Sequence, residues 1–214
     1  MATALKMPAR YVEQYTGIVI FQPREGQNRN ALYEEICRMY TEHPKIEQDK
    51  EGNVYLMPPS GGESGKQDLM ASAQLAVWAL RKGHGEAFGP TTAFVFPSGA
   101  KRCPDAAWAS NERVYAIPYR KRRGRISIVP EFVIEIKSPT DVYEKLQEKM
   151  QEYIADGVDL GWLIHPDRRE VKVYTEAETG TLTDIEKLRG MGPVKGFTLD
   201  LRPIWRSLRG ERKE

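Results

Sequence analysis

The stretch "EFVIEIKSPTD", residues 131–141, places two charged side chains in an otherwise apolar run. The alternation is typical of a β-strand, with one face formed by Phe132, Ile134 and Ile136 and the other by Val133, Glu135 and Lys137. A buried carboxylate costs several kcal/mol unless it is paired or binds a metal. A strand that is buried on this face therefore needs a partner for Glu135. The alternative is a solvated face on which Glu135 and Lys137 form a marginal surface pair.

The residues after this strand predict a helix and two further strands. Apolar side chains recur at helical spacing at Tyr143, Leu146, Met150 and Tyr153. Asp141 and Glu144 resemble a capping box at the start of this helix, and Gly157 is expected to end it. Strands are expected at residues 160–165 and 170–174, with His165 ending the first and a turn through Pro166 and Asp167.

The chain before residue 66 predicts one helix and one hairpin. The segment "NRNALYEEICRMYTEHP", residues 28–44, has helical spacing and is expected to stop at Pro44. A turn at Gly52 and Asn53, followed by a strand at residues 54–57, indicates a hairpin. The segment "SGGESG", residues 60–65, is expected to be a flexible loop.

Residues 66–81 predict an amphipathic core helix. The expected apolar face consists of Leu69, Ala73, Ala76, Val77 and Leu80, and the expected terminators are Gly83 and Gly85. Three short strands around 87, 94–96 and 105–109 are expected to form a meander, and residues 111–130 a polar, basic connection. This order of elements, without an internal repeat, predicts an α/β (α+β) fold with one mixed sheet flanked by helices.

The composition favours an ordinary globular protein and excludes several classes. The chain has 214 residues, with 32 basic against 30 acidic side chains, so net charge alone does not indicate nucleic-acid binding. Two cysteines, Cys37 and Cys103, with three histidines at unsuitable spacing, indicate free thiols and no zinc site. The sequence contains no membrane-spanning run, and the start "MATALKMPAR" lacks the apolar core of a secretory signal, so a cytoplasmic location is expected.

A second acid, Asp105 in "CPDAAWAS" at residues 103–110, changes the interpretation of Glu135. If the strand that Asp105 begins is an antiparallel neighbour of the strand containing Glu135, the two carboxylates and the Lys137 ammonium meet. Two carboxylates at such a short distance repel each other unless a divalent cation lies between them. The pair therefore indicates a metal site.

"PD" at 104–105 followed by "EIK" at 135–137 is the pattern of the PD-(D/E)XK nuclease superfamily. Longer segments, including "MPPSGGESG", "LQEKMQEYIADGVDLGWLIHP", "VKVYT" and "VKGFTLDLRPIW", closely resemble the Uma-two family of restriction-endonuclease-like proteins. The resemblance runs from about residue 45 to 205. It implies a restriction-endonuclease-like core in one compact domain, with residues 45–214 as the nuclease domain and residues 1–44 as an N-terminal extension and helix packed on it.

The resemblance also implies an activity, a cofactor and partners. The expected activity is Mg²⁺-dependent hydrolysis of phosphodiester bonds in DNA by a homodimer without an organic cofactor, with Mn²⁺ as a substitute metal. Asp105, Glu135 and the main-chain carbonyl of Ile136 would hold the metal, and Lys137 would orient the attacking water. Glu63 matches an acid that many superfamily members contribute from the first core helix, although a glutamate is also favoured there by the helix macrodipole.

Two groups of residues are candidates for nucleic-acid binding. The run "YRKRRGR", residues 119–125, supplies Arg120, Lys121, Arg122, Arg123 and Arg125. Lys145, Gln147 and Lys149 are expected on the polar side of the helix after the Glu135 strand, where one of them reaches the site or a phosphate. The alternatives are a solvated loop and a solvated helix face. A non-catalytic nucleic-acid-binding or interaction module on the same scaffold also remains open.

Overall fold

The structure is a computed structural model that describes residues 10–13, 18–42, 45–82 and 84–206. Pro44 and Gly83, which were expected to end two helices, and most of the start "MATALKMPAR" lie outside these residues. No helix among the described residues is long and apolar enough to cross a membrane.

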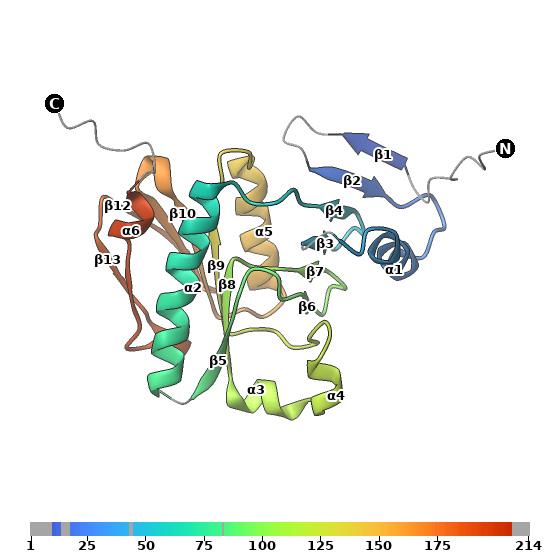
Figure 1. The fold of residues 1–214 in the computed structure, drawn as a ribbon. Coiled ribbons are helices and arrows are strands. Elements are labelled where there is room, and N and C mark those ends of the chain that lie inside the picture. The colour runs from blue at the N-terminus through green and yellow to red at the C-terminus, as the bar shows by residue number, and fades with distance from the viewer. Residues whose placement is uncertain (1–9, 14–17, 43–44, 83, 207–214) are drawn as a thin grey trace.

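A mixed six-stranded sheet forms the centre of the molecule (Figure 1). Its strands, in spatial order, are β12 (Thr179–Thr183), β11 (Glu170–Tyr174), β10 (Leu160–His165), β9 (Phe132–Ile136), β8 (Ala106–Ser110) and β5 (Gly85–Phe88). The β9 and β10 strands are parallel and joined through a helix, whereas every other neighbouring pair is antiparallel. The predicted mixed sheet flanked by helices is confirmed.

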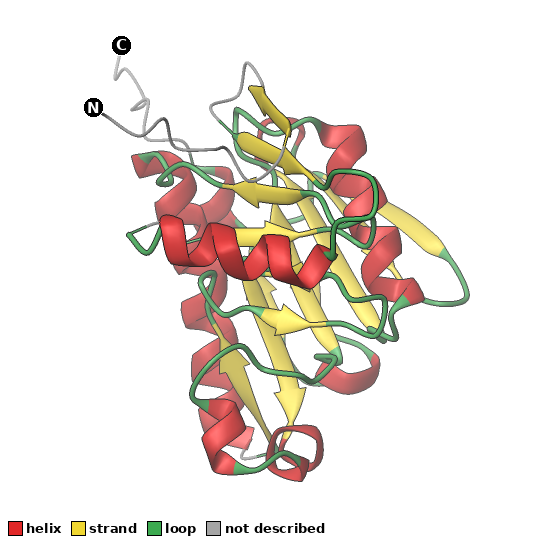
Figure 2. Ribbon diagram, turned by 90° about the vertical axis from the view of Figure 1, so that its right-hand side faces the viewer, coloured by secondary structure: helices red, strands yellow, loops and turns green. Residues whose placement is uncertain are grey.

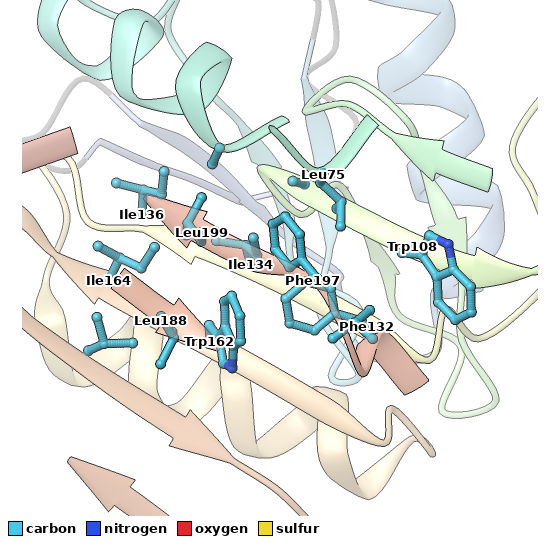
Figure 3. Close-up of a cluster of buried hydrophobic side chains, with 14 of the residues drawn as sticks. Leu75, Trp108, Phe132, Ile134, Ile136, Trp162, Ile164, Leu188, Phe197 and Leu199 are labelled. Atoms are coloured by element: carbon cyan, nitrogen blue, oxygen red, sulfur yellow. The ribbon is translucent and has the colours of Figure 1, made fainter. Parts of the chain in front are cut away.

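Strand β9 is buried on both faces because a long helix covers each side of the sheet. Alternate residues Phe132, Ile134 and Ile136 pack with α2 (Gly62–Lys82), and Figure 3 shows this cluster. On the other face, Val133 packs with Met150 of α5 (Tyr143–Ala155). Glu135 follows Val133 on the α5 face, so the strand buries its carboxylate in the layer beneath α5.

A second six-stranded sheet brings the N-terminal segment beside the α5 face. Its order is β1 (Arg10–Glu13), β2 (Val19–Gln22), β4 (Val54–Leu56), β3 (Ile46–Gln48), β7 (Lys101–Arg102) and β6 (Phe94–Val95). Helix α1 (Arg29–Met39) packs its buried residues on β2, β3 and β4 (Figures 1 and 2). The predicted hairpin is confirmed as β3 and β4. Pairing of β2 with β4 crosses the expected boundary at residues 44–45, and the domain division itself stays a prediction.

The C-terminal segment packs against α2. A small sheet pairs β13 (Lys187–Arg189) with β14 (Thr198–Asp200), and the 3₁₀ turn η2 (Gly192–Val194) lies between them. The last helix is α6 (Arg202–Trp205), and another 3₁₀ turn, η1 (Pro166–Arg168), joins β10 to β11. Gln67 and Gln74 of α2 donate to the backbone carbonyls of Ile204 and Asp200. These bonds fix the rotation of α2 about its axis.

That rotation corrects the predicted face of α2. The helix begins at Gly62, so the expected flexible loop at residues 60–65 is partly helical. The residues that pack on the sheet are Ala71, Leu75 and Ala79, whereas Leu69 and Leu80 are 60% and 83% exposed. Helix α2 is apolar on two sides, and helical spacing alone did not distinguish the core side from the outer side.

Two further expectations, the meander and the capping box, are wrong for identifiable reasons, and the polar, basic connection at 111–130 is partly helical. The meander is interrupted because β5 pairs directly with β8, and the β6 and β7 strands join the second sheet. The connection at 111–130 contains α3 (Asn111–Ala116), which Ser110 caps, and α4 (Tyr119–Arg122). The capping box fails because Asp141 accepts a hydrogen bond from Ser138 N–H in the preceding turn, and Val142 is the N-cap of α5.

Candidate active site

Asp105 lies directly before the first residue of β8, where two strands and a helix fix it. Its side chain is buried, and its Oδ2 accepts a hydrogen bond of 2.8 Å from the backbone N–H of Ile136. Its Oδ1 accepts a hydrogen bond of 2.9 Å from the Lys45 ammonium, which precedes β3. Ser72 of α2 donates to the main-chain carbonyl of Asp105 at 3.0 Å. The carboxylate is therefore bound to both the central strand and the N-terminal segment.

Glu135 is 3% exposed and is held by α5. Its Oε1 accepts a hydrogen bond of 2.8 Å from the Tyr153 hydroxyl and forms an ion pair of 2.8 Å with the Lys149 ammonium. Burial raises the pKa of Glu135 to about 7, an effect that Lys149 opposes and the nearby charge of Asp105 reinforces. The carboxyl therefore exchanges its proton near neutral pH.

Two cations, the half-buried Lys45 and the buried Lys149, lie between the carboxylates. The Lys149 ammonium is 2.8 Å from Glu135 Oε1 and 3.0 Å from Glu47 Oε1, and the Lys45 ammonium is 3.9 Å from the same Glu47 oxygen. Burial disfavours charge on both lysines, but the surrounding carboxylates outweigh it and raise both pKa values. Both side chains are therefore cationic at neutral pH, which suits charge stabilisation and excludes a role as general base.

Helix α2 contributes two acids to the same region. Asp68 lies one helical turn before Ser72, and burial raises its pKa to about 8, with Asp105 adding to the rise and Lys45 opposing it. Glu63 lies in the first turn of α2 and is half-buried. The first-helix acid expected from the sequence is therefore represented by two candidates, of which Asp68 is electrostatically coupled to Asp105.

These side chains meet at a cavity of about 320 Å³. Its rim is formed by the loop before α2, residues 57–61, and by the loop after β9, residues 138–141. The charged residues that line it are Lys45, Glu63, Asp68, Asp105, Glu135, Asp141 and Lys149. Ile136 also lines the cavity. The cavity thus collects side chains from α2, β9, α5 and the segments preceding β3 and β8.

The donor set suits a hard divalent cation. Asp105 and Glu135 offer carboxylate oxygens, and Mg²⁺ in proteins is commonly held by one or two carboxylates while it keeps several waters. The described part of the chain contains no group of three or more acids, histidines or cysteines already placed around a metal position. The Lys45 ammonium lies on Asp105 Oδ1, so a metal at that oxygen would replace an ion pair.

Lys137 does not line this cavity, although the sequence pattern assigned it the role of the site lysine. Its ammonium donates to the main-chain carbonyl of Ser138 at 2.9 Å, and its backbone N–H donates to Ile164. The ammonium beside Glu135 comes from Lys149 of α5 instead. Two basic side chains at unrelated positions in the sequence can supply a positive charge at the same place, and the role that the motif assigns to Lys137 stays a prediction.

The other predicted residues of α5 also lie outside the cavity. The Lys145 ammonium pairs with Glu148 at 2.7 Å on an exposed face. Gln147 Oε1 accepts a hydrogen bond of 2.5 Å from Lys172 of β11. One of these three α5 residues was expected to reach the site or a phosphate, and Lys149 is the one whose ammonium lies beside the carboxylates.

The basic run at residues 119–125 lies at the other end of the central sheet. Asp105 precedes β8, whereas α3 and α4 follow the last residue of β8 (Figure 1). The Arg122 guanidinium lies over the rings of Tyr115 and Tyr119, at 4.8 and 5.7 Å from their centroids. Arg125 pairs with Glu34 of α1. The remaining basic side chains, Arg120, Lys121 and Arg123, are exposed.

Sequence reasoning missed Asp68, Lys45 and Glu47. Asp68 had a detectable signal, because it lies three and seven residues before Ala71 and Leu75 and so shares their side of α2. The wrong choice of apolar face placed it away from the core. Lys45 and Glu47 had no local signal, since they reach the site through pairing of β3 with β7.

Comparisons with known proteins agree with this architecture. A crystal structure titled as "a putative nuclease belonging to DUF820 from Anabaena variabilis ATCC 29413" is similar, with 23% sequence identity and a TM-score of 0.61. The similarity covers 76% of this chain and 90% of that one, and at this identity it shows the fold. No curated protein matches the chain.

The family comparison covers most of the sequence. The Uma2 family, described as "Putative restriction endonuclease", matches residues 33–202, which include β3, the carboxylates, α5 and the C-terminal sheet. That match extends over well more than half of the 214 residues. The chain belongs to the Uma2 family.

Proposed function

We propose that this protein is a Mg²⁺-dependent endonuclease that hydrolyses phosphodiester bonds in DNA, with Mn²⁺ as a substitute metal. One observation carries the proposal: Asp105, directly before β8, and Glu135, in the neighbouring strand β9, line one cavity with a lysine ammonium paired with each. Family membership and the fold shared with the DUF820 protein support the same reaction class.

Individual residues of the chain would have different roles in such a site. Asp105 and Glu135 would hold the metal, with the Ile136 carbonyl as a third oxygen donor and Asp68 or Glu63 as a further carboxylate. A bound metal supplies an acidified water and neutralises charge on the phosphate. Tyr153 and Lys149 fix the orientation of Glu135, because both bond its Oε1.

Lys149 would stabilise the anionic transition state. Its ammonium stays protonated at neutral pH and lies at a lining position of the cavity. Fixed positive charge in a site that excludes bulk water is usually the largest contribution to catalysis. Lys45 would act differently, since its ammonium neutralises Asp105 and would have to leave Asp105 Oδ1 for that oxygen to hold a metal.

We also propose that the three exposed basic side chains, Arg120, Lys121 and Arg123, contact DNA phosphates away from the cavity. Arg122 and Arg125 are already engaged with tyrosine rings and with Glu34, so we place the phosphate contacts on the other three. Replacing all three exposed residues by glutamine is expected to weaken binding at every sequence and to reduce the slope of log affinity against log salt by up to about 3. An unchanged slope would remove this segment from the DNA surface.

The proposal is tested by cleavage of supercoiled plasmid and branched DNA with Mg²⁺, Mn²⁺ or EDTA. Wild-type protein is expected to nick or cut only with metal, and Asp105→Ala is expected to abolish cleavage. A thermal shift measured with Mn²⁺ accompanies the assay. Metal-induced stabilisation of the wild type that disappears in Asp105→Ala supports the site. Cleavage that persists in Asp105→Ala would overturn it.

A second function, a non-catalytic binding or interaction module, is favoured by the charge balance of the cavity. Lys45 and Lys149 already neutralise the acids, as they would in an ordinary buried ion-pair cluster. This alternative predicts that Mn²⁺ gives no thermal shift, that DNA binding ignores EDTA, and that Asp105→Asn leaves stability unchanged or improves it.

A further inference from the structure

Helices α3 and α4 present two tyrosine rings to solvent. Tyr115 is 55% exposed and Tyr119 is 68% exposed, whereas the other tyrosines whose burial the structure describes are buried or half-buried. Both rings lie at the end of the central sheet where β8 finishes (Figure 1). A ring that is left this open adds little apolar burial to the fold, so its surface is available to a ligand.

The two rings are held in a fixed orientation. The Arg122 guanidinium lies over both, 4.8 Å from the ring centroid of Tyr115 and 5.7 Å from that of Tyr119. The Tyr115 hydroxyl donates a hydrogen bond of 2.8 Å to Glu86 of β5. The guanidinium covers one face of each ring and leaves the opposite face to solvent, in agreement with the exposed fractions. An aromatic surface that is already oriented loses little conformational entropy when a flat ligand stacks on it.

The rings are not needed to anchor this segment to the sheet. Ser110 caps α3, and Val114 is buried in the core cluster beneath it. Arg113 pairs with Glu131 at 3.0 Å and donates to the Val129 carbonyl at 2.8 Å. Anchoring therefore does not explain why two aromatic rings are exposed here.

The charge around the rings suits a phosphate backbone. Residues 111–125 contain one acid, Glu112, against the basic residues Arg113, Arg120, Lys121, Arg122, Arg123 and Arg125. Arg120, Lys121 and Arg123 are exposed, and the buried Arg122 Nε has no hydrogen-bond partner among the described residues. Aromatic rings flanked by basic side chains are typical of single-stranded nucleic-acid sites, because bases stack on the rings while the cations contact phosphates.

We propose that Tyr115 and Tyr119, with the Arg122 guanidinium over both, form a platform that binds unpaired bases of single-stranded DNA. Each ring stacks with one base through its open face, and the three exposed basic side chains contact the neighbouring phosphates. Bases inside a duplex are already stacked on both faces, so they cannot use the rings. The tyrosine platform therefore selects DNA that has a single-stranded part.

The link between this platform and cleavage rests on the proposed endonuclease function. Asp105 directly precedes β8 and α3 directly follows it, so at least the length of this five-residue strand, about 17 Å, separates the cavity from the platform. One DNA strand covers this distance in about five nucleotides at duplex spacing. A branched substrate can therefore place its duplex at the cavity and its single-stranded arm on the platform.

The first test measures binding in EDTA, so that it does not depend on cleavage. By fluorescence anisotropy, the full-length protein is expected to bind a labelled oligo(dU) more tightly than a duplex of the same length. Tyr115→Ala with Tyr119→Ala is expected to weaken oligo(dU) binding by about 30-fold or more, the loss of two stacked bases, and duplex binding by less than about 2-fold. Tyr115→Phe with Tyr119→Phe keeps both rings and retains the affinity. Met191→Ala, which removes another exposed apolar side chain, is the matched control.

The salt dependence separates stacking from phosphate contacts. The alanine pair is expected to lower the affinity for oligo(dU) without changing the slope of log affinity against log salt, since stacking releases no counterions. The glutamine variant of Arg120, Lys121 and Arg123 is expected to change that slope instead. Equal oligo(dU) affinities of wild type and the alanine pair, or a preference of wild type for the duplex, would overturn the proposal.

The second test uses wild-type protein and does not depend on the folding of a variant. An oligo(dU) that carries 5-iodouracil, irradiated in the complex, is expected to crosslink to a peptide containing Tyr115 or Tyr119, as identified by mass spectrometry. Crosslinks confined to other peptides would overturn the platform. Tighter binding of oligo(U), which differs in its 2′-hydroxyl groups, would overturn DNA as the partner. All these readouts are obtained without metal, so a lack of plasmid cleavage would count against the endonuclease function alone.

Discussion

Lys149 and Lys137 differ in what their ammonium groups contact. Lys149 bonds two buried carboxylates and lines the cavity, whereas Lys137 bonds the carbonyl of its neighbour Ser138. Lys149→Met, which keeps the apolar stem, is expected to lower single-turnover cleavage by about 10² to 10³-fold. Lys137→Met is the matched control and retains most of the activity. The reverse ranking, measured on variants whose folding is checked by circular dichroism, would return the catalytic role to Lys137.

Glu135 and Asp68 give the protein a stability that falls as pH rises. Burial raises the folded pKa of Glu135 from 4.5 to about 7 and that of Asp68 from 3.8 to about 8. At a pH between the unfolded and the folded pKa of each group, the folded state retains a proton that the unfolded chain has released. The free energy of unfolding therefore decreases as the pH rises. Glu135→Gln is expected to stabilise the protein at pH 8 by about 1 to 3 kcal/mol and to flatten this slope.

The measurement is urea unfolding at several pH values. Glu47 serves as an internal contrast, because Lys149, Lys45 and Arg102 outweigh its burial and lower its pKa to about 2. Its stabilising contribution is present above the unfolded pKa and is lost as the pH falls toward 2. If the free energy of unfolding changes with pH in the same way for wild type and Glu135→Gln, the Glu135 carboxyl is ionised in the folded state over the whole measured pH range.

At this scale the sequence named Asp105, Glu135, Ile136, Glu63 and Lys149, which all line the cavity, but it did not name Asp68 or Lys45. Asp105 and Glu135 follow from local patterns, an acid at the start of an apolar segment and an acid inside a strand. Lys149 was visible only as a polar residue on a helix, and Lys45 reaches Asp105 from 60 positions away in the chain. Contacts over such separations depend on tertiary packing, which local spacing does not encode.

Among the elements, those with a strong period were predictable. The α5 stripe of Tyr143, Met150 and Tyr153 is buried, and β9, β10 and β11 lie close to their expected positions. The prediction of the buried face of α2 was wrong because two sides of this helix are apolar. The pairing of β5 with β8 was not predicted, because the β6 and β7 strands between them in the sequence belong to another sheet.

The β5–β8 pair depends on a glycine at its end. A Cβ on Gly85 would lie 2.4 Å from the Ala109 carbonyl oxygen and 2.4 Å from Trp108 Cζ2. Neither the strand backbone nor a packed indole moves easily, so Gly85→Ala is expected to destabilise the protein by about 2 to 4 kcal/mol. Gly89→Ala, where a Cβ meets nothing within 4 Å, is the control for denaturant unfolding. Equal denaturant midpoints of unfolding for the two variants would contradict the close approach of β5 to β8.

Across the whole molecule, a buried ion-pair network joins the second sheet to the central layer. Arg102 of β7 bonds Glu152 of α5 at 2.8 Å and Glu47 of β3 at 3.3 Å. Glu47 in turn pairs with Lys149, which bonds Glu135 in β9. The N-terminal elements are thus coupled to the candidate site by charge as well as by strand pairing.

Arg102→Met is expected to weaken that coupling. It leaves Glu152 without its buried cation and removes one of the cations beside Glu47, a change that costs about 3 to 5 kcal/mol. The four tryptophans all lie in or against the core cluster between the central sheet and α2, so their fluorescence reports that layer, whereas far-UV circular dichroism reports both sheets. In wild type the two probes are expected to give one coincident urea transition.

In Arg102→Met the circular dichroism change is expected to begin at a lower urea concentration than the fluorescence change, because the second sheet separates first. Adding Glu152→Gln should recover part of the lost stability, since it removes the unpaired charge while keeping the side-chain shape. If the unfolding transitions seen by the two probes still coincide in Arg102→Met, backbone pairing and apolar contacts alone hold the two sheets together. The ion-pair network then serves only to set the charge state of Glu47 and Lys149 beside Glu135.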